Sequence, residues 1–384
     1  MVIALILFSR FFACNLNLPE IGSERYFFSW REPTRLFLKS QGRVPRTSEM
    51  NLIISTSGRS TGERVPTLAS TPFPSPINDT SKIAKMGFLR KYIFPILFGV
   101  IFFSLFKNHL PKFKVLSALE TIDLLKKNDK LSLVRFGDGE FDIIAQKRGP
   151  NYQRTSPRLR EALLKILNSR SICVAVPEAL SVDVLTPENS TNSHLRFWRT
   201  YVVLRAQLFR HILDSTRLYG DACVSRPYTN SQDDQLATQV FRQIRTLWAN
   251  KNVVVIEGEL TRFGVGNDLL NDAASVKRII GPAKNAFEKC DQLLEEARKQ
   301  PEDTIFIVAL GPAAKIIAYE LSNQFKTLDL GHLDIEYEWY LRKMKEGGSV
   351  PNKYVNEARV NFDSESEPFD PSLYESQIIA KFLN

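Results

Sequence analysis

The chain has 384 residues, of which 43% are hydrophobic and 26 are phenylalanine, enough apolar material for one large or two small globular domains. Its formal net charge is +9, but the basic residues are scattered and form no block interleaved with aromatic residues, so a nucleic-acid-binding groove is not expected. The four cysteines form no C-x-x-C pair, which argues against a structural zinc site and excludes a dense disulfide framework.

The N-terminal part of the chain differs in composition from the rest. Residues 40–83 are rich in Ser, Thr, Pro and Arg, so residues 1–85 are expected to be disordered, or to be an extension that the expressed protein lacks. An apolar run at 92–106 follows two basic residues, and residues 86–108 are expected to form a short signal-anchor helix. A cleaved signal-peptide core or a buried core helix is the alternative for this run.

From residue 115 the hydrophobic pattern is that of a globular domain. The predicted elements are, in chain order, helix 117–127, strand 131–136, helix 140–146, helix 157–168, strand 171–176, helices 190–214 and 231–250, strands 253–256 and 276–280, helix 284–299, strand 304–310, helix 313–323 and strand 326–330. This alternation predicts an α/β fold with a mostly parallel sheet and helices on both faces. The domain is expected to span 115–345, with a C-terminal tail at 346–384.

The first strand of this domain runs directly into Gly-Asp-Gly-Glu, which places Asp138 and Glu140 at its carboxyl end. Open α/β sheets bind their ligands at that edge. Two carboxylates in this position suit Mg²⁺ or Mn²⁺ that carries a phosphate-bearing substrate. For the motif taken alone, a surface loop whose acids face water is the alternative.

Later strands also end in polar or glycine-containing segments. Strand 253–256 is followed by Glu257 and Glu259. Strand 304–310 is followed by Gly311 at the start of a helix, where free backbone N–H groups favour an anion. A tight turn between strand and helix would explain Gly311 equally well.

The last predicted strand is followed by ionisable residues at alternating positions, namely His332, Asp334, Glu336 and Glu338. As a strand, this segment would carry these four side chains on one face and apolar side chains on the other. A surface strand has the same alternation, so the pattern does not assign a function by itself.

Five segments, in matching order and spacing, resemble the GT-D fold glycosyltransferase family, which was formerly a domain of unknown function. They are 134–140, 225–228, 257–268, 281–287 and 309–339. The resemblance covers about residues 115–345. It implies a Rossmann-like domain of GT-D type that uses Mn²⁺ or Mg²⁺. Such a domain would transfer a sugar from a nucleotide donor to a glycan or glycoconjugate acceptor. The resemblance implies that the donor is a UDP-sugar.

The resemblance also implies roles for individual residues. Asp138 and Glu140 would serve the centre formed by the metal and the diphosphate. His332 and Glu338 would be active-site residues and candidate bases for the acceptor hydroxyl, with Glu257 or Glu259 behind them. The residues expected near the donor are Arg135, Arg262, Asn267, Asp268 and, at its helix N-terminus, Gly311.

Two other functions remain open from the sequence. One is a metal-dependent phosphohydrolase on a similar sheet, which needs no acceptor, and the other is an inactive protein that binds a nucleotide sugar or a glycan. The apolar run at 92–106 is unlike the soluble bacterial proteins of the family. It implies a single-pass membrane protein of the Golgi or endoplasmic reticulum with a lumenal catalytic domain.

Overall fold

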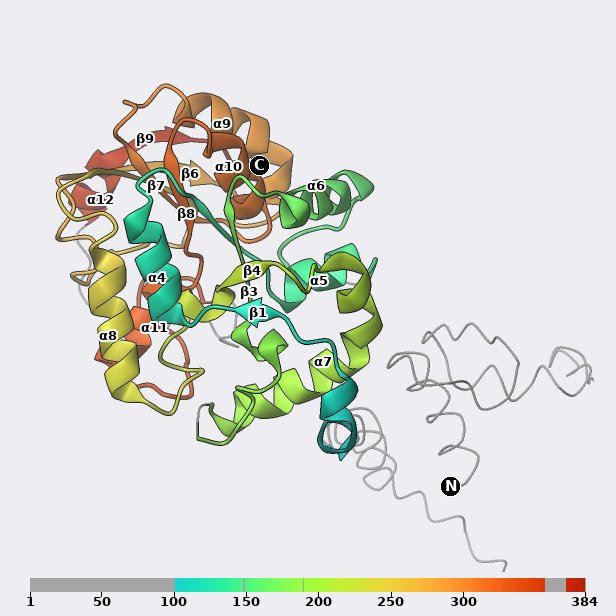
Figure 1. Cartoon of the computed structure of the whole chain (residues 1–384). Coiled ribbons are helices and arrows are strands. Elements are labelled where there is room, and N and C mark those ends of the chain that lie inside the picture. The colour runs from blue at the N-terminus through green and yellow to red at the C-terminus, as the bar shows by residue number, and fades with distance from the viewer. Residues whose placement is uncertain (1–100, 148, 189, 356–370, 384) are drawn as a thin grey trace, which may run out of the picture. The chain divides into compact units, whose positions relative to one another are not determined.

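The computed structural model describes residues 101–383 except 148, 189 and 356–370 (Figure 1). Within these residues, nine strands form one sheet in which every pairing is parallel, so the predicted parallel α/β sheet is confirmed. The strands, in sheet order, are β1 (Lys114–Val115), β4 (Leu218–Asp221), β3 (Cys173–Val176), β2 (Leu133–Arg135), β8 (Lys326–Asp329), β7 (Ile305–Ala309), β5 (Asn252–Gly258), β6 (Ser275–Gly281) and β9 (Ile378–Lys381).

Helices pack on both faces of this sheet, as the sequence predicts. One core joins the sheet to α5 (Asp138–Ile144), α6 (Pro157–Asn168), α7 (Asn192–Ile212), α9 (Cys290–Ala297) and α10 (Ala313–Leu321). A second core joins it to α4 (Ala118–Lys127), α8 (Asp234–Arg245) and α11 (Leu333–Leu341). The remaining helical elements are α12 (Pro371–Gln377) and the 3₁₀ turns η2 (Lys107–His109), η3 (Glu178–Ser181), η4 (Ala222–Ser225) and η5 (Ala286–Lys289).

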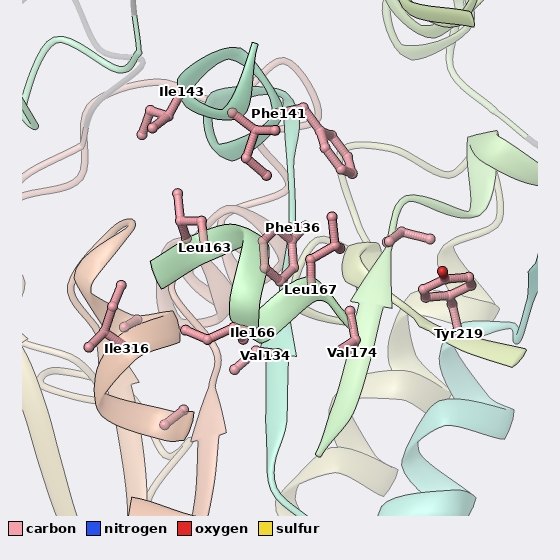
Figure 2. Packing of buried hydrophobic residues seen from close by; sticks show 14 of the residues in the cluster. Val134, Phe136, Phe141, Ile143, Leu163, Ile166, Leu167, Val174, Tyr219 and Ile316 are labelled. Atoms are coloured by element: carbon pink, nitrogen blue, oxygen red, sulfur yellow. The ribbon is translucent and has the colours of Figure 1, made fainter. Parts of the chain in front are cut away.

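Alternation along the strands divides their side chains between the two cores. In β5, Val254 and Ile256 belong to the first core, whereas Val253 and Val255 belong to the second. Figure 2 shows part of the first core, where Val134 of β2 lies among apolar side chains of α6. Because helices cover both faces, a ligand has access to the sheet only at the strand ends.

The order of the strands creates a switch point between β2 and β8. From β2 the chain moves outward to β3 and β4 on one side, whereas β8 comes from the other half of the sheet and pairs with β2. The loops that follow β2 and β8 therefore lead away from a shared crevice. Ligands of open α/β sheets bind at such a switch point.

The segment that follows β8 is a helix and not the strand considered from its alternating pattern. Leu333–Leu341 forms α11, in which Asp334, Glu336 and Glu338 are all buried. In a helix, Asp334 and Glu338 share one face, and Lys353 Nζ contacts both, at 2.7 Å and 3.0 Å. Glu336 instead accepts hydrogen bonds from the backbone N–H groups of Tyr228 and Thr229. Buried cations and N–H groups therefore stabilise the three acids.

Three strands were not predicted, and one of them lies in the expected C-terminal tail. The edge strands β1 and β9 and the inner strand β4 are short, and β4 contains the sequence Leu-Tyr-Gly-Asp, which lacks a strand pattern. Strand β9 pairs in parallel with β6, and Phe382 N donates to Ile280 O at 2.8 Å. The sheet therefore extends beyond the boundary expected at residue 345.

Most of the apolar run at 92–106 lies outside the described residues, as does the expected extension at 1–85. The described end of the run, 101–106, is helical, and its Phe103 is buried, with the Arg199 guanidinium 5.4 Å from the centre of its ring. Among residues 101–383, apart from the gaps, we find no helix with the length and hydrophobicity needed to span a membrane.

Candidate active site

A cavity of about 680 Å³ lies at the carboxyl ends of the strands. Asp138, Asp329 and Gly311 line its centre, where β2, β8 and β7 end. One side of the cavity extends to α7, and the other extends to the ends of β5 and β6. The cavity thus occupies the switch point of the sheet, where a nucleotide would bind in a Rossmann-like fold.

The centre of this cavity contains a buried cluster of ion pairs that joins three elements. Lys315 Nζ of α10 lies 3.0 Å from Glu140 Oε1 of α5 and 3.2 Å from Asp329 Oδ2 of β8. Glu140 Oε2 also accepts a hydrogen bond from Gly137 N at 2.9 Å, which caps the start of α5. Both carboxylate oxygens of Glu140 therefore already have partners.

Arg135 supplies a second cation to the cluster. Its Nη2 lies 3.1 Å from Asp329 Oδ1, its Nε donates to Asp329 O at 2.6 Å and its backbone N–H donates to Asp329 Oδ2 at 3.0 Å. Burial alone would raise the pKa of Asp329, but Lys315 and Arg135 outweigh burial and hold that pKa below its usual value. Asp329 is therefore an anion that holds two cations at the switch point.

Asp138 differs from the other acids of the cavity because its carboxylate accepts a hydrogen bond from its own backbone N–H and is attracted by the charge of Arg226 without forming an ion pair with it. It is the first residue of α5, its side chain is exposed to the cavity, and no hydrogen bond or ion pair joins this side chain to another described residue. Partial burial by the cavity walls raises the pKa of Asp138, and the negative charge of Glu140 raises it further. Asp138 is therefore available to a ligand, above all to a cation.

The residues of the cavity fit a divalent cation only with substrate as a further ligand. In the part of the chain that the structure describes, no three His, Cys, Asp or Glu side chains converge as a metal-binding group. Mg²⁺ commonly binds through one or two carboxylates and completes its shell with substrate phosphates and water. Asp138 suits that role, whereas Glu140 would first have to leave Lys315. Four acids line the cavity, namely Asp138, Glu140, Asp142 and Asp329, and three cations, namely Arg135, Arg226 and Lys315. The acids exceed the cations by one charge, which favours a bound cation.

Gly311 lines the cavity at the turn from β7 into α10. Its φ is +55°, and a Cβ atom at this position would lie 2.6 Å from Cε2 of Tyr152. Glycine therefore permits both the left-handed turn and the close approach of Tyr152. Ala314 N donates to Gly311 O at 3.1 Å and Lys315 N donates to Pro312 O at 3.3 Å, so backbone hydrogen bonds close the first turn of α10. The positive end of the helix dipole, rather than a set of free N–H groups, would favour an anion here.

Of the three residues expected to be catalytic, only His332 lines the cavity. Glu338 is 3% exposed and lies in a buried network, where Asn267 Nδ2 donates to its Oε1 at 2.7 Å and Lys353 Nζ lies 3.0 Å away. Glu257 is fully buried and paired with Arg278 Nη1 at 2.7 Å. Glu338 and Glu257 are therefore engaged in buried pairs and do not line this cavity.

The residues expected near the donor are likewise divided. Arg135 and Gly311 line the cavity, whereas Arg262, Asn267 and Asp268 do not. The Arg262 guanidinium donates to Asn352 O at 2.7 Å and Asn267 Nδ2 donates to Asp334 Oδ1 at 2.8 Å. Asp268 accepts from the Tyr337 hydroxyl at 2.7 Å and pairs with Arg245. Arg262, Asn267 and Asp268 therefore connect the loop after β5 to Asn352, to α11 and to α8.

Several residues that line the cavity were not expected from the sequence. Lys315 and Asp329 form its ion-pair cluster, and the side chains His194, Phe197 and Trp198 of α7 form one wall. Lys315 could have been found as the single cation of the otherwise apolar start of α10. The spacing of the α7 residues, at i, i+3 and i+4, could have indicated a shared helix face.

Comparisons with known proteins agree with this geometry. The family model described as glycosyltransferase GT-D fold matches residues 133–358. A probable glycosyl transferase, Gly, of Streptococcus gordonii is 35% identical over 278 residues, which are 69% of this chain and 38% of that protein. Glycosyltransferase GlyD of Streptococcus pneumoniae is 34% identical over 271 residues, which are 69% of this chain and 32% of that protein.

Solved structures give the same result. A structure described as a new glycosyltransferase from Streptococcus sanguinis is 32% identical, with a TM-score of 0.64, and the match covers 71% of this chain and all of that one. The chain spans less than two fifths of the length of the two curated relatives, so the match concerns only part of those larger proteins. The sheet, the cavity at its switch point and the family model that matches more than half of the residues together show that this chain belongs to the GT-D fold glycosyltransferase family.

Proposed function

We propose that this protein is a metal-dependent glycosyltransferase that moves a sugar from a nucleotide donor, a UDP-sugar, to a hydroxyl group of a glycan or glycoconjugate acceptor. The observation that carries the proposal is Asp138, whose side chain pairs with no other described residue, beside the ion-pair cluster at the switch point. Membership of the GT-D family supports the transfer of a sugar rather than the hydrolysis of a phosphate ester.

Stabilisation of the leaving nucleoside diphosphate is the main chemical requirement of this reaction. Asp138 would hold Mn²⁺ or Mg²⁺, which neutralises charge on the diphosphate as the anomeric bond breaks. The positive end of the α10 dipole, beside Gly311, would favour the same negative charge. Lys315 and Arg135 keep Glu140 and Asp329 neutralised, so that these two acids do not repel the donor.

A base must accept the proton of the attacking acceptor hydroxyl. His332 is our candidate because it lines the cavity where β8 leads into α11, close in sequence to Asp329 of the cluster. Imidazole is a common general base in enzymes. If His332 has this role, its replacement by glutamine lowers kcat for transfer and leaves the affinity for the donor nucleotide unchanged.

A screen of the full-length protein against UDP-, GDP- and CMP-sugars with Mn²⁺ tests the proposal. Each reaction is assayed for the free sugar, the nucleoside diphosphate and inorganic phosphate. We expect release of UDP and free sugar from a UDP-sugar, with water as a slow acceptor, and loss of this activity in EDTA. Release of inorganic phosphate without intact UDP would instead identify a phosphohydrolase, and binding of UDP-sugars without turnover would identify an inactive binding protein.

We also propose, from the sequence alone, attachment to a membrane through residues 92–106, with the catalytic domain in the lumen of the Golgi or endoplasmic reticulum. Alkaline carbonate extraction of cell membranes tests the attachment, and protease protection of sealed vesicles tests the side. Release of the protein by carbonate, or digestion of the catalytic domain in intact vesicles, would contradict this proposal.

A further inference from the structure

One wall of the cavity is formed by aromatic side chains of α7. Phe197 is 46% exposed although it lines the cavity, and Trp198 beside it is 7% exposed. The Phe197 ring stacks on Tyr201 with centroids 5.5 Å apart and meets the edge of Trp198 at 5.2 Å. These two neighbours hold the Phe197 ring in place, while nearly half of its surface remains uncovered. A rigid, exposed aromatic ring in a cavity is a platform for a flat apolar ligand surface.

Tyr201 connects this platform to the charged centre of the cavity. Its hydroxyl lies 3.1 Å from Asp138 O and 3.0 Å from Asp142 Oδ1, and its single proton is shared between these two acceptors. Arg205, one turn further along α7, pairs with the same Asp142 oxygen at 2.7 Å. The helix that carries Phe197 is thus fixed to the start of α5, where Asp138 lies. A ligand that rests on Phe197 lies next to the place where the donor would react.

The groups around the platform are suited to hydroxyl groups. His194, Arg226 and Asn230 line the same side of the cavity. Burial lowers the pKa of His194 to about 4, against a hydrogen bond to Asn230 that raises it, so the imidazole is neutral near pH 7 and carries one donor and one acceptor. Hydroxyl groups of a sugar both donate and accept hydrogen bonds, whereas a phosphate only accepts them. The α7 side of the cavity therefore resembles a site for a polyhydroxylated ring.

The opposite side of the cavity has a different lining, and this difference indicates which substrate binds on which side. At the ends of β5 and β6 this side is lined by the small residues Gly258, Thr261 and Ala283, beside the larger Tyr152, Leu260 and Tyr354. Small residues allow the backbone to approach a planar nucleobase closely. With the donor nucleotide on that side and its diphosphate at the centre, the α7 side is left for the acceptor.

We propose that His194, Phe197 and Trp198 form the acceptor subsite, and that a hexopyranose ring of the acceptor stacks its C–H face on Phe197. This inference rests on the proposed glycosyltransferase function, for which it specifies the acceptor as a neutral sugar ring. It assigns Phe197 to binding rather than to chemistry.

Saturation-transfer NMR on the full-length protein tests the subsite. The probes are the methyl β-glycosides of glucose, galactose and N-acetylglucosamine, each measured with and without UDP and Mn²⁺. The variants are Phe197→Ala, which removes the ring, Phe197→Tyr, which keeps it, and Leu341→Ala as a control, because Leu341 is similarly exposed, at 48%, and does not line the cavity.

We expect saturation of the ring protons of at least one glycoside with the wild type, Phe197→Tyr and Leu341→Ala. With Phe197→Ala we expect its apparent affinity to fall about tenfold, as for the loss of an aromatic anchor. The inference is overturned if the wild type saturates none of the three glycosides, or if Phe197→Ala binds them as the wild type does.

Binding of UDP with Mn²⁺, followed by isothermal titration in the same variants, separates this inference from the function on which it rests. We expect all variants to bind UDP as the wild type does. A tenfold loss of UDP affinity in Phe197→Ala would place the nucleobase on the platform and overturn the inference alone. Absence of UDP binding in the wild type would instead contradict the proposed function, whatever the glycosides do.

Discussion

Lys315 Nζ lies 3.0 Å from Glu140 Oε1, so the second acid of the Asp-Gly-Glu motif is neutralised by a lysine within the protein itself. The sequence presents Asp138 and Glu140 as an equivalent pair of metal ligands. In the structure they differ, because Glu140 caps α5 and pairs with Lys315, whereas the Asp138 side chain pairs with no other described residue. The motif therefore combines one structural acid with one acid that is available to a ligand.

Replacement of Lys315 by methionine is expected to destabilise the protein by about 3–5 kcal/mol, because it leaves Glu140 and Asp329 buried without this cation. Urea unfolding at pH 7 measures the change in the free energy of unfolding. A matched control is Lys299→Met, which removes a lysine from an ion pair with Glu296 at the surface and is expected to have no measurable effect.

The double variant Lys315→Met with Glu140→Gln should recover part of the stability lost by Lys315→Met, since it removes the charge of Glu140, which has lost its cation, whereas Asp329 keeps Arg135. The loss in the single variant should also diminish at low pH, where protonation neutralises the buried acids. Equal stability of Lys315→Met and the wild type at pH 7 would show that the cluster contributes nothing to folding.

The pKa of His194 predicts how stability depends on pH. Burial holds this pKa at about 4 in the folded protein, against an ordinary value of 6.5. Below pH 6.5 the unfolded chain therefore binds a proton that the folded chain refuses, so stability falls as the pH drops from 6.5 to about 4 and then levels off. The shift corresponds to on the order of 3 kcal/mol.

The contribution of His194 is measured by comparing wild type and His194→Gln in urea unfolding at a series of pH values. Glutamine keeps hydrogen-bonding capacity but does not titrate in this range. The difference in free energy between the two proteins should change between pH 6.5 and 4 and be constant above pH 7. If the difference in unfolding free energy stayed constant across the whole pH range, His194 would be protonated equally in the folded and the unfolded protein.

Two glycines allow the backbone strain at Gly311 to be separated from its contact with Tyr152. Gly311 and Gly266 both have positive φ, +55° and +78°, but a Cβ at Gly266 would meet no atom within 4 Å. Gly266→Ala should therefore cost only the backbone strain, about 1–2 kcal/mol. Gly311→Ala should cost about 1–3 kcal/mol more, because its Cβ would collide with the Tyr152 ring.

The same measurements include a test of that explanation. In a Tyr152→Ala background, the loss of unfolding free energy caused by Gly311→Ala should fall to the loss caused by Gly266→Ala in the wild type. Urea unfolding of the wild type, Gly311→Ala, Tyr152→Ala and the double variant, compared with Gly266→Ala, measures this. An unchanged additional cost in this background would show that Tyr152 is not the obstacle.

The sequence was sufficient to predict those parts of the fold that depend on local pattern. Strands β2, β3, β5, β6, β7 and β8 were all expected, and β3, β5 and β7 consist mainly of a continuous apolar run. Helix α11 was not recognised because nearly all of its residues are buried, so it shows no amphipathic period. Strand β9 was missed because it exists only through its pairing with β6, about a hundred residues earlier.

The candidate site was predicted where it depends on strand ends, and missed where it depends on distant partners. Asp138, Arg135, Gly311 and His332 follow or end strands and do line the cavity. Glu257 has the sequence appearance of a catalytic acid, but Arg278, on the neighbouring strand and 21 residues away, holds it in the interior. A sequence pattern does not reveal such a partner, because the pairing of β5 with β6 creates it.

The central claim is that Asp138 binds a nucleoside diphosphate through a divalent cation. Isothermal titration of UDP into the wild type, Asp138→Asn and Glu259→Gln, each with Mn²⁺ and with EDTA, tests it most directly. Glu259 is the matched control because it is an exposed acid at the end of β5 that does not line the cavity. We predict Mn²⁺-dependent UDP binding in the wild type and Glu259→Gln, and its loss in a folded Asp138→Asn protein. UDP binding by Asp138→Asn with wild-type affinity, or by the wild type in EDTA as tightly as with Mn²⁺, would contradict the claim.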